Sequence, residues 1–189
     1  MFAIQYKNVG VGFIAPLLWL FASHTAVAET PAPVKIAVFP FELEDFGAAS
    51  KGGEQPHLAE STEEARKQLA ASSRYTPIDT ASADMSTAKG QPLRDCGGCE
   101  AGIASKLGAD QAMIGVISRI SNTEYLIKLR VSDAHTGAVI SNYESELRMG
   151  ADYSWSRGVR SLMQNRVLTE PAPAPANTAA AQAEKASGH

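Results

Sequence analysis

The chain has 189 residues, of which 44% are hydrophobic and 20% are charged, an ordinary composition for a globular protein. This length suits one domain, or two at most. The formal net charge is −3 at pH 7. Nucleic-acid-binding proteins of this size usually carry a basic excess, so we expect no nucleic acid partner.

Residues 1–28 have the three parts of a secretory signal peptide. Lys7 is their only charged residue, residues 9–22 form an apolar run, and Ala26-Val27-Ala28 is a small-x-small cleavage pattern. The apolar run is shorter than the roughly 20 residues that span a bilayer, so we predict cleavage after Ala28 and no retained anchor. No cysteine follows the cleavage site directly and no later apolar run could span a membrane. We therefore expect a soluble protein in the periplasm of a Gram-negative envelope.

Segments rich in proline and alanine flank the predicted domain. Residues 29–33 form a short linker. Residues 169–189 are low in hydrophobicity and alternate proline with alanine, so we predict a disordered tail. Between these segments, residues 34–168 are predicted to form a single domain.

The first elements of this domain alternate between strand and helix. Residues 34–41 are apolar and rich in β-branched and aromatic side chains, which predicts a buried strand. The polar residues 42–55 predict a loop. Residues 56–72 predict a helix because apolar positions recur at helical spacing, and its buried face would consist of Leu58, Thr62, Ala65 and Leu69.

A short second strand (75–79), a long polar loop (80–95) and a second helix (96–107) are predicted next, with Asp95 as the helix N-cap.

Three consecutive strands are predicted in the next part of the chain, at 111–120, 124–134 and 138–147. Tight turns join them, which favours an antiparallel meander. The second strand alternates, so Tyr125, Ile127, Leu129 and Val131 would face one side and Lys128, Arg130 and Ser132 the other. In the third strand, one set of alternating side chains would face the same side of the sheet: Val139, Ser141, Tyr143, Ser145 and Leu147.

A last helix, 153–167, would carry an apolar face of Trp155, Val159, Leu162 and Met163. The predicted order is β-α-β-α-β-β-β-α. It indicates an α/β (α+β) fold with a mixed sheet, a C-terminal antiparallel meander and helices packed on the sheet.

Several motifs in combination resemble a known group of proteins. They are VKIAVFPF, SSRYTPID, the Cys-x-x-Cys pair before KLGADQAMIGVISRIS, and YLIKLRVSDAHTGAVI. This pattern resembles the periplasmic α/β modules related to the N-terminal domain of TolB, to CsgG and to LpoB. It is also similar to a family of predicted secreted bacterial proteins without assigned function.

The resemblance implies the fold and a role in protein–protein contacts of the envelope, without chemistry. It implies no particular partner, because one fold can carry many functions. The chain lacks the lipidated cysteine of CsgG and LpoB, so outer-membrane anchoring is not carried over.

The sharpest local feature is the pair Cys96 and Cys99. Export would place it in an oxidising compartment, which favours a structural disulfide that ties the 80–95 loop to the following helix. A redox-active dithiol is an alternative, since a helix N-terminus favours the thiolate. A metal site is the third alternative, but it needs about four ligands and no further ligands lie at suitable spacing. We predict a disulfide, no metal and no cofactor.

Two segments mix charged and aromatic residues of the kinds enriched in interface hot spots. The first candidate contact group is Arg148, Tyr153, Trp155, Arg157 and Arg160. The alternative is that Trp155 is a core anchor and the arginines form a solvated face. The second group is Glu44 and Phe46, in the acidic loop after the first strand.

These features lead to three functional hypotheses. The first is a non-enzymatic periplasmic accessory or assembly protein that binds another, unidentified envelope protein. The second is a thiol–disulfide redox protein that uses Cys96 and Cys99, the one enzymatic alternative. The third is a small-molecule-binding adaptor of a transporter or dehydrogenase system.

Overall fold

The computed structural model of the chain describes residues 32–46, 52–121, 123–148 and 154–169. The predicted signal peptide, most of the predicted linker and all but the first residue of the predicted tail lie outside the described residues.

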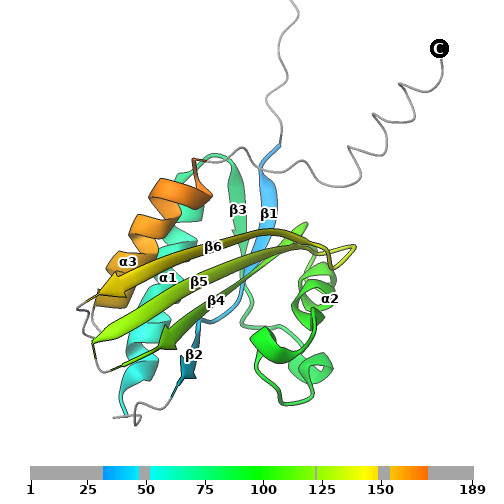
Figure 1. Ribbon diagram of the computed structural model, residues 1–189. Helices are drawn as coiled ribbons and strands as arrows, with labels where there is room; N and C mark the ends of the chain where they lie inside the picture. The colour runs from blue at the N-terminus through cyan, green and yellow to red at the C-terminus, as the bar shows by residue number, and fades with distance from the viewer. Residues whose placement is uncertain (1–31, 47–51, 122, 149–153, 170–189) are drawn as a thin grey trace, which may run out of the picture. The chain divides into compact units, whose positions relative to one another are not determined.

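Six strands form one mixed sheet, in the order β3-β1-β4-β5-β6 with β2 also beside β4 (Figure 1). β1 runs parallel to β3 and β4, β2 runs parallel to β4, and β4, β5 and β6 form an antiparallel meander. The predicted α/β fold with a mixed sheet is therefore confirmed. The strands are β1 (Val34–Val38), β2 (Glu42–Asp45), β3 (Tyr75–Ile78), β4 (Gln111–Arg119), β5 (Glu124–Asp133) and β6 (Val139–Arg148).

β4 lies at the centre of the sheet, and all nine of its residues are buried. Its apolar sequence fits this position, because a strand covered on both faces needs no polar side. Gly115 has a special role in β4: the ring of Phe41 packs where a Cβ atom at Gly115 would stand. The absence of a side chain at Gly115 thus lets an aromatic ring lie directly on the backbone of the central strand.

The prediction of a loop over residues 42–55 is wrong for its first four residues, which form β2, and for its last two, which begin the first helix. The chain leaves the sheet after β1 at Pro40, and the Phe41 N–H donates to Thr62 Oγ1 at 2.9 Å. It then returns to pair with the second half of β4, from Glu42 opposite Val116 to Asp45 opposite Arg119. The segment is polar, because this edge strand is half-buried at three positions and exposed at the fourth, and its composition therefore concealed the strand.

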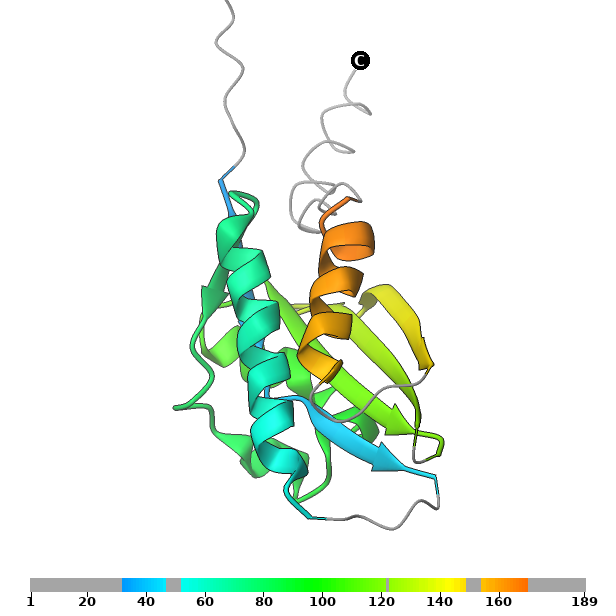
Figure 2. The ribbon, with the colours of Figure 1, turned by 90° about the vertical axis from the view of Figure 1, so that its left-hand side faces the viewer.

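Two helices lie side by side on one face of the sheet, α1 (Glu54–Ala71) and α3 (Trp155–Leu162) (Figure 2). Arg160 of α3 holds Glu64 of α1 through two hydrogen bonds, of 2.7 and 3.0 Å. A π-helical turn, η4 (Met163–Val167), follows α3. The apolar faces predicted for both helices are confirmed, because all their members are buried: Leu58, Thr62, Ala65, Leu69, Trp155, Val159, Leu162 and Met163.

The other face of the sheet is partly covered by α2 (Cys99–Lys106) and the short helices η1 (Met85–Ala88) and η2 (Leu93–Asp95). The predicted start of α2 at Cys96 is wrong. Gly97 and Gly98 have φ angles of 69° and 96°, which a right-handed helix cannot contain. Gly98 is therefore the N-cap instead of Asp95.

The side-chain alternation predicted for β5 is confirmed, but the prediction for β6 is wrong at its first residue. The register of β5 and β6 shifts between Val131 and Ser132, where the pairing is irregular. Val139, expected on the same side as Tyr143, is 52% exposed whereas Tyr143 is buried, and Ile140 packs against the core instead. A bulge of this kind reverses the direction of the side chains on one side of it.

We predict that Gly115→Ala destabilises the protein by about 1–3 kcal/mol, because the new methyl group must displace the ring of Phe41 in a packed core. Gly102→Ala is the matched control, since the exposed Gly102 lies within α2 with open space around it. We expect it to stabilise by about 0.5–1 kcal/mol. Urea unfolding of both variants measures the difference, and equal effects would contradict the packing argument.

Candidate functional site

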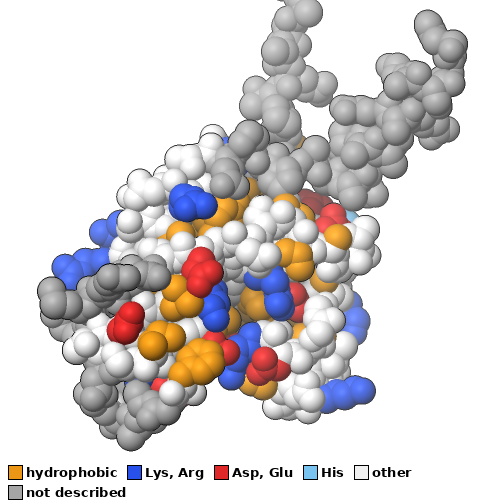
Figure 3. All heavy atoms as spheres, viewed as in Figure 1, with side chains coloured by type: hydrophobic (Ala, Val, Ile, Leu, Met, Phe, Trp, Pro, Cys, Tyr) orange, Lys and Arg blue, Asp and Glu red, His pale blue; other side chains and the backbone are white. Residues whose placement is uncertain are grey.

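A groove of about 340 Å³ lies on the face of the sheet that carries α2, and no residue of α2 lines it. Figure 3 shows this face, where charged side chains of both signs alternate with apolar ones. The polar and charged residues that line the groove are Glu44, Arg94, Asp95, Lys128, Arg130, Asn142 and Glu144.

The pleat of the meander explains how β5 and β6 supply the groove. Lys128 lies opposite Glu144 and Arg130 opposite Asn142, so these four side chains share one face of the sheet. Sequence alternation had assigned Lys128 and Arg130 to the side away from the apolar core, and this is confirmed. It could not show that β2 and η2 would bring further charges beside them.

Glu44 of β2 is held at one side of the groove. It accepts a hydrogen bond from Ser118 Oγ at 2.5 Å and one from Lys128 Nζ at 3.4 Å. The hydrogen bond from Ser118 lowers the pKa of Glu44 most, and the positive charge of Lys128 lowers it further, against the opposing effect of burial. The carboxylate is therefore kept ionised in the groove.

The two residues of the second predicted contact group, Glu44 and Phe46, meet at Lys128. The Lys128 ammonium lies 3.4 Å from Glu44 Oε2 and 6.0 Å from the centre of the Phe46 ring. Phe46 is 59% exposed, so a large apolar ring stands at the surface beside paired charges. An exposed aromatic ring beside a charged groove is a feature of protein-binding surfaces.

The described members of the first predicted contact group are in α3, on the opposite side of the sheet: Trp155, Arg157 and Arg160. Trp155 is 0% exposed, and its ring packs edge-on against Tyr125 and His57, with centroid distances of 5.3 and 6.2 Å. Trp155 is therefore a core anchor, the alternative considered from the sequence, and its side chain is not available to a partner.

The remaining members of that group do not form one surface within the described residues. Arg160 is bound to Glu64, and this pairing lowers the pKa of Glu64. Arg157 is exposed on α3. The side chain of Arg148 and all of Tyr153 lie outside the described part of the structure.

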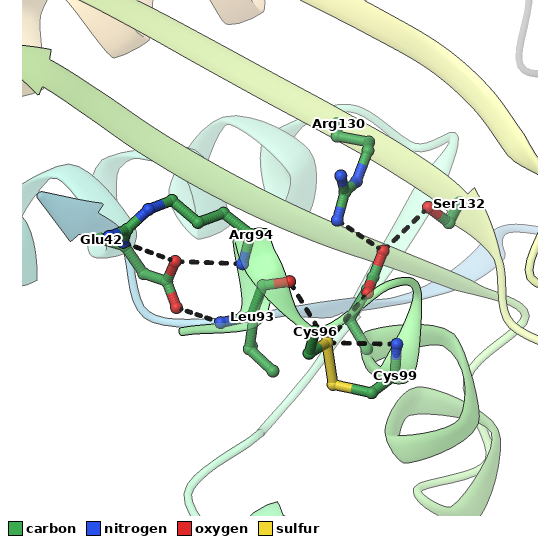
Figure 4. The surroundings of a disulfide bond; sticks show 8 residues. Glu42, Leu93, Arg94, Cys96, Cys99, Arg130 and Ser132 are labelled. Atoms are coloured by element: carbon green, nitrogen blue, oxygen red, sulfur yellow. Dashed lines mark hydrogen bonds and ion pairs between the residues drawn. A yellow bond between two sulfur atoms is a disulfide. The ribbon is translucent and has the colours of Figure 1, made fainter. Parts of the chain in front are cut away.

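Cys96 and Cys99 are joined by a disulfide bond, as predicted (Figure 4). The backbone N–H of Cys99 donates to Cys96 Sγ at 3.2 Å. Both cysteines are half-buried and pack against the core between α2 and the sheet. Cys96 directly follows Arg94 and Asp95, so the disulfide lies next to the wall of the groove.

Two carboxylates hold the disulfide-bearing segment on the sheet (Figure 4). Glu42 of β2 accepts the backbone N–H groups of Leu93 and Arg94, at 2.6 and 3.2 Å. Glu100 of α2 accepts hydrogen bonds from Arg130 Nη2 and Ser132 Oγ of β5, at 3.0 and 3.3 Å. The sequence pattern did not single out Arg94 or Glu100, and it marked Glu42 only as part of an acidic segment, because their partners across this site are distant in the chain.

Among the described residues, one group of side chains has the composition of a metal site: Cys96, Cys99 and Glu100, whose ligand atoms lie within 4.8 Å of one another. In the oxidised protein, the two sulfur atoms are bonded to each other.

No helix in the described part of the chain is long and apolar enough to cross a bilayer.

These features define a small α/β module built on a mixed six-stranded sheet. The chain belongs to the family DUF3280, described as "Protein of unknown function (DUF2380)", whose model matches residues 34–167. Among curated proteins, none matches the chain significantly.

Several solved structures are similar in fold. The C-terminal domain of LpoB from Salmonella enterica is 17% identical, with a TM-score of 0.45, and the match covers 64% of this chain and 87% of that domain. Lipoprotein GNA1162 from Neisseria meningitidis is 15% identical, with a TM-score of 0.46 and coverages of 72% and 95%. TolB from Acinetobacter baumannii is 15% identical, with a TM-score of 0.44, and the match covers 74% of this chain but 29% of TolB.

We predict that Ser118→Ala raises the pKa of Glu44 towards its ordinary value of 4.5, because the hydrogen bond from Ser118 is the main cause of the lowering. A carboxyl group whose pKa is lowered by folding stabilises the protein above its unfolded pKa, and this contribution is lost as the pH falls through the folded pKa. The stability difference between wild type and variant should therefore shrink in acid. Carboxyl ¹³C NMR titration of Glu44 measures the shift, and an unchanged pKa would exclude this cause.

Proposed function

We propose that the protein is a non-enzymatic accessory module of the bacterial cell envelope, which binds another envelope protein through the groove on the open face of its sheet. The groove, with Phe46 at its edge, is the observation that carries the proposal. The predicted signal peptide and the sequence resemblance to TolB- and LpoB-like modules support a periplasmic location.

The chemistry of the groove favours a protein partner. Arg94, Lys128 and Arg130 supply positive charges, while Glu44, Asp95 and Glu144 supply negative ones. A surface of mixed sign cannot follow a nucleic acid backbone, which is uniformly negative. A folded protein can match both signs, and matched charges set the orientation of the complex and raise the association rate. The exposed Phe46 ring would occupy an apolar recess of that partner.

A thiol–disulfide redox protein is the second candidate, because the cysteine pair lies at the N-terminus of α2. The Cys99 N–H, 3.2 Å from Cys96 Sγ, would stabilise a Cys96 thiolate. The buried Glu100 carboxylate, 3.7 Å from the same sulfur, would repel it. The two effects oppose each other, so the position of the pair does not favour a reactive thiolate.

The reduction potential of the pair separates these two functions. A structural disulfide has a potential below about −300 mV, whereas a redox carrier lies well above it. We expect the lower value, measured by equilibration with a dithiol of known potential. A potential near that of thiol oxidants would favour the redox function instead.

We expect a photo-cross-linking amino acid at Asn142 to capture the partner in intact envelopes, because Asn142 is an exposed residue of the groove. The same label at Ala70, exposed on α1, is the positional control.

Affinity for the purified partner should fall about tenfold in Lys128→Glu, which corresponds to about 1.4 kcal/mol.

The matched control is Lys67→Glu, the same charge reversal at an exposed position of α1 on the other side of the sheet. It should bind like the wild type. Equal loss in both variants, or equal capture from Ala70, would show that the groove is not the binding surface. Ligand-dependent melting with envelope metabolites, without protein capture, would favour the small-molecule adaptor.

A further inference from the structure

Among the described residues of the oxidised protein, one carboxylate oxygen of Glu100 has no hydrogen-bond donor. The residue is 1% exposed. Its Oε1 atom is bound by Arg130 and Ser132, whereas among the described residues the neighbour of its Oε2 atom is Cys96 Sγ, at 3.7 Å. A disulfide sulfur carries no hydrogen and cannot donate. A buried charged oxygen without a donor is costly and needs an explanation.

The distance between this oxygen and Cys96 Sγ matches the distance between two ligand atoms of one tetrahedral metal ion. Zinc binds thiolate sulfur at about 2.3 Å and carboxylate oxygen at about 2.1 Å, so their mutual distance around one ion is about 3.6 Å. Cys96 Sγ and Glu100 Oε2 are already 3.7 Å apart. Two sulfur ligands of the same ion lie about 3.8 Å apart, so the two sulfur atoms must separate once the disulfide is reduced.

The residues between the cysteines allow this separation. Gly97 and Gly98 both have positive φ angles, and no atom lies within 4 Å of the Cβ positions that side chains would occupy there. The turn between Cys96 and Cys99 is therefore free of packing contacts at these two positions. Arg130 and Ser132 meanwhile fix the Glu100 carboxylate, as partners of metal ligands commonly do.

The charges of the site favour a divalent ion of intermediate softness. Two thiolates, the Glu100 carboxylate, the Arg130 guanidinium and one divalent cation sum to zero. Zinc accepts both sulfur and carboxylate ligands, whereas calcium and magnesium bind oxygen and avoid thiolates. Three protein ligands would leave a fourth position for water.

We propose that the reduced protein binds one zinc ion through Cys96 Sγ, Cys99 Sγ and Glu100 Oε2. A dithiol reductant supplies two electrons and two protons to the disulfide, which becomes two thiols while the reductant becomes a disulfide. Zinc then binds as both thiols release their protons to solvent. The oxidised protein holds the same three side chains in place without the ion.

The test uses the purified protein reduced with a phosphine under argon, in which the phosphine is oxidised to its oxide and the disulfide becomes two thiols. Cobalt(II) is added as a spectroscopic probe and zinc then displaces it. We expect one cobalt per chain, a thiolate-to-cobalt charge-transfer band, and loss of the band with one equivalent of zinc. The oxidised protein should show no band.

Glu100→Gln should weaken zinc binding by at least about tenfold, and Cys99→Ser should abolish the charge-transfer band of the three-ligand site. Asp95→Asn is the matched control, because Asp95 is an exposed carboxylate next to Cys96, and it should bind zinc like the wild type. Circular dichroism establishes that each variant is folded.

Two results would overturn the proposal. One is a reduced wild-type protein that binds no cobalt or zinc, in which a Cys96 thiol donates to Glu100 instead. The other is a folded Glu100→Gln variant with the affinity of the wild type, which would show that the carboxylate is not a ligand.

Discussion

The sheet depends on the close contact between Phe41 and the backbone of β4 at Gly115. β4 pairs with β1 and β2 along one side and with β5 along the other, so its position sets the position of each of them. The ring of Phe41 lies where the chain passes from β1 to β2. This packing lets two short strands follow one another along β4, and it brings Glu44 to the groove and Glu42 to η2.

The open face of the sheet is organised by carboxylates from distant parts of the chain. Glu42 and Glu100 fasten the segment between η2 and α2 to β2 and β5, and Glu44 fastens Lys128 beside Phe46. The groove and the disulfide are therefore neighbours that share Arg130, which lines the groove and binds Glu100. A change at the cysteines would reach the groove through this arginine.

Periodicity was sufficient to predict the features that depend on burial, including the apolar faces of α1 and α3 and the alternation of β5. It failed where backbone dihedral angles, or pairing with a strand distant in the chain, determine the secondary structure. β2 was missed because its polar residues gain their pairing only from β4, 74 positions further on. The start of α2 was misplaced because two glycines adopt positive φ.

Of the candidate contact residues, Glu44 and Phe46 lie at the groove, whereas Trp155 fills the core. The sequence could not separate these two places for Trp155, because a tryptophan on an amphipathic helix suits either.

The parallel pairing of β1 has a consequence for the order in which the protein folds. Its partner Gln111 in β4 follows Ile36 by 75 residues, whereas the turns of the meander join β4, β5 and β6 within short loops. Closing a long loop costs more chain entropy than closing a short one, and non-local pairing slows folding. We therefore expect the meander to form before β1 pairs with β4, although the ribosome synthesises β1 before the meander.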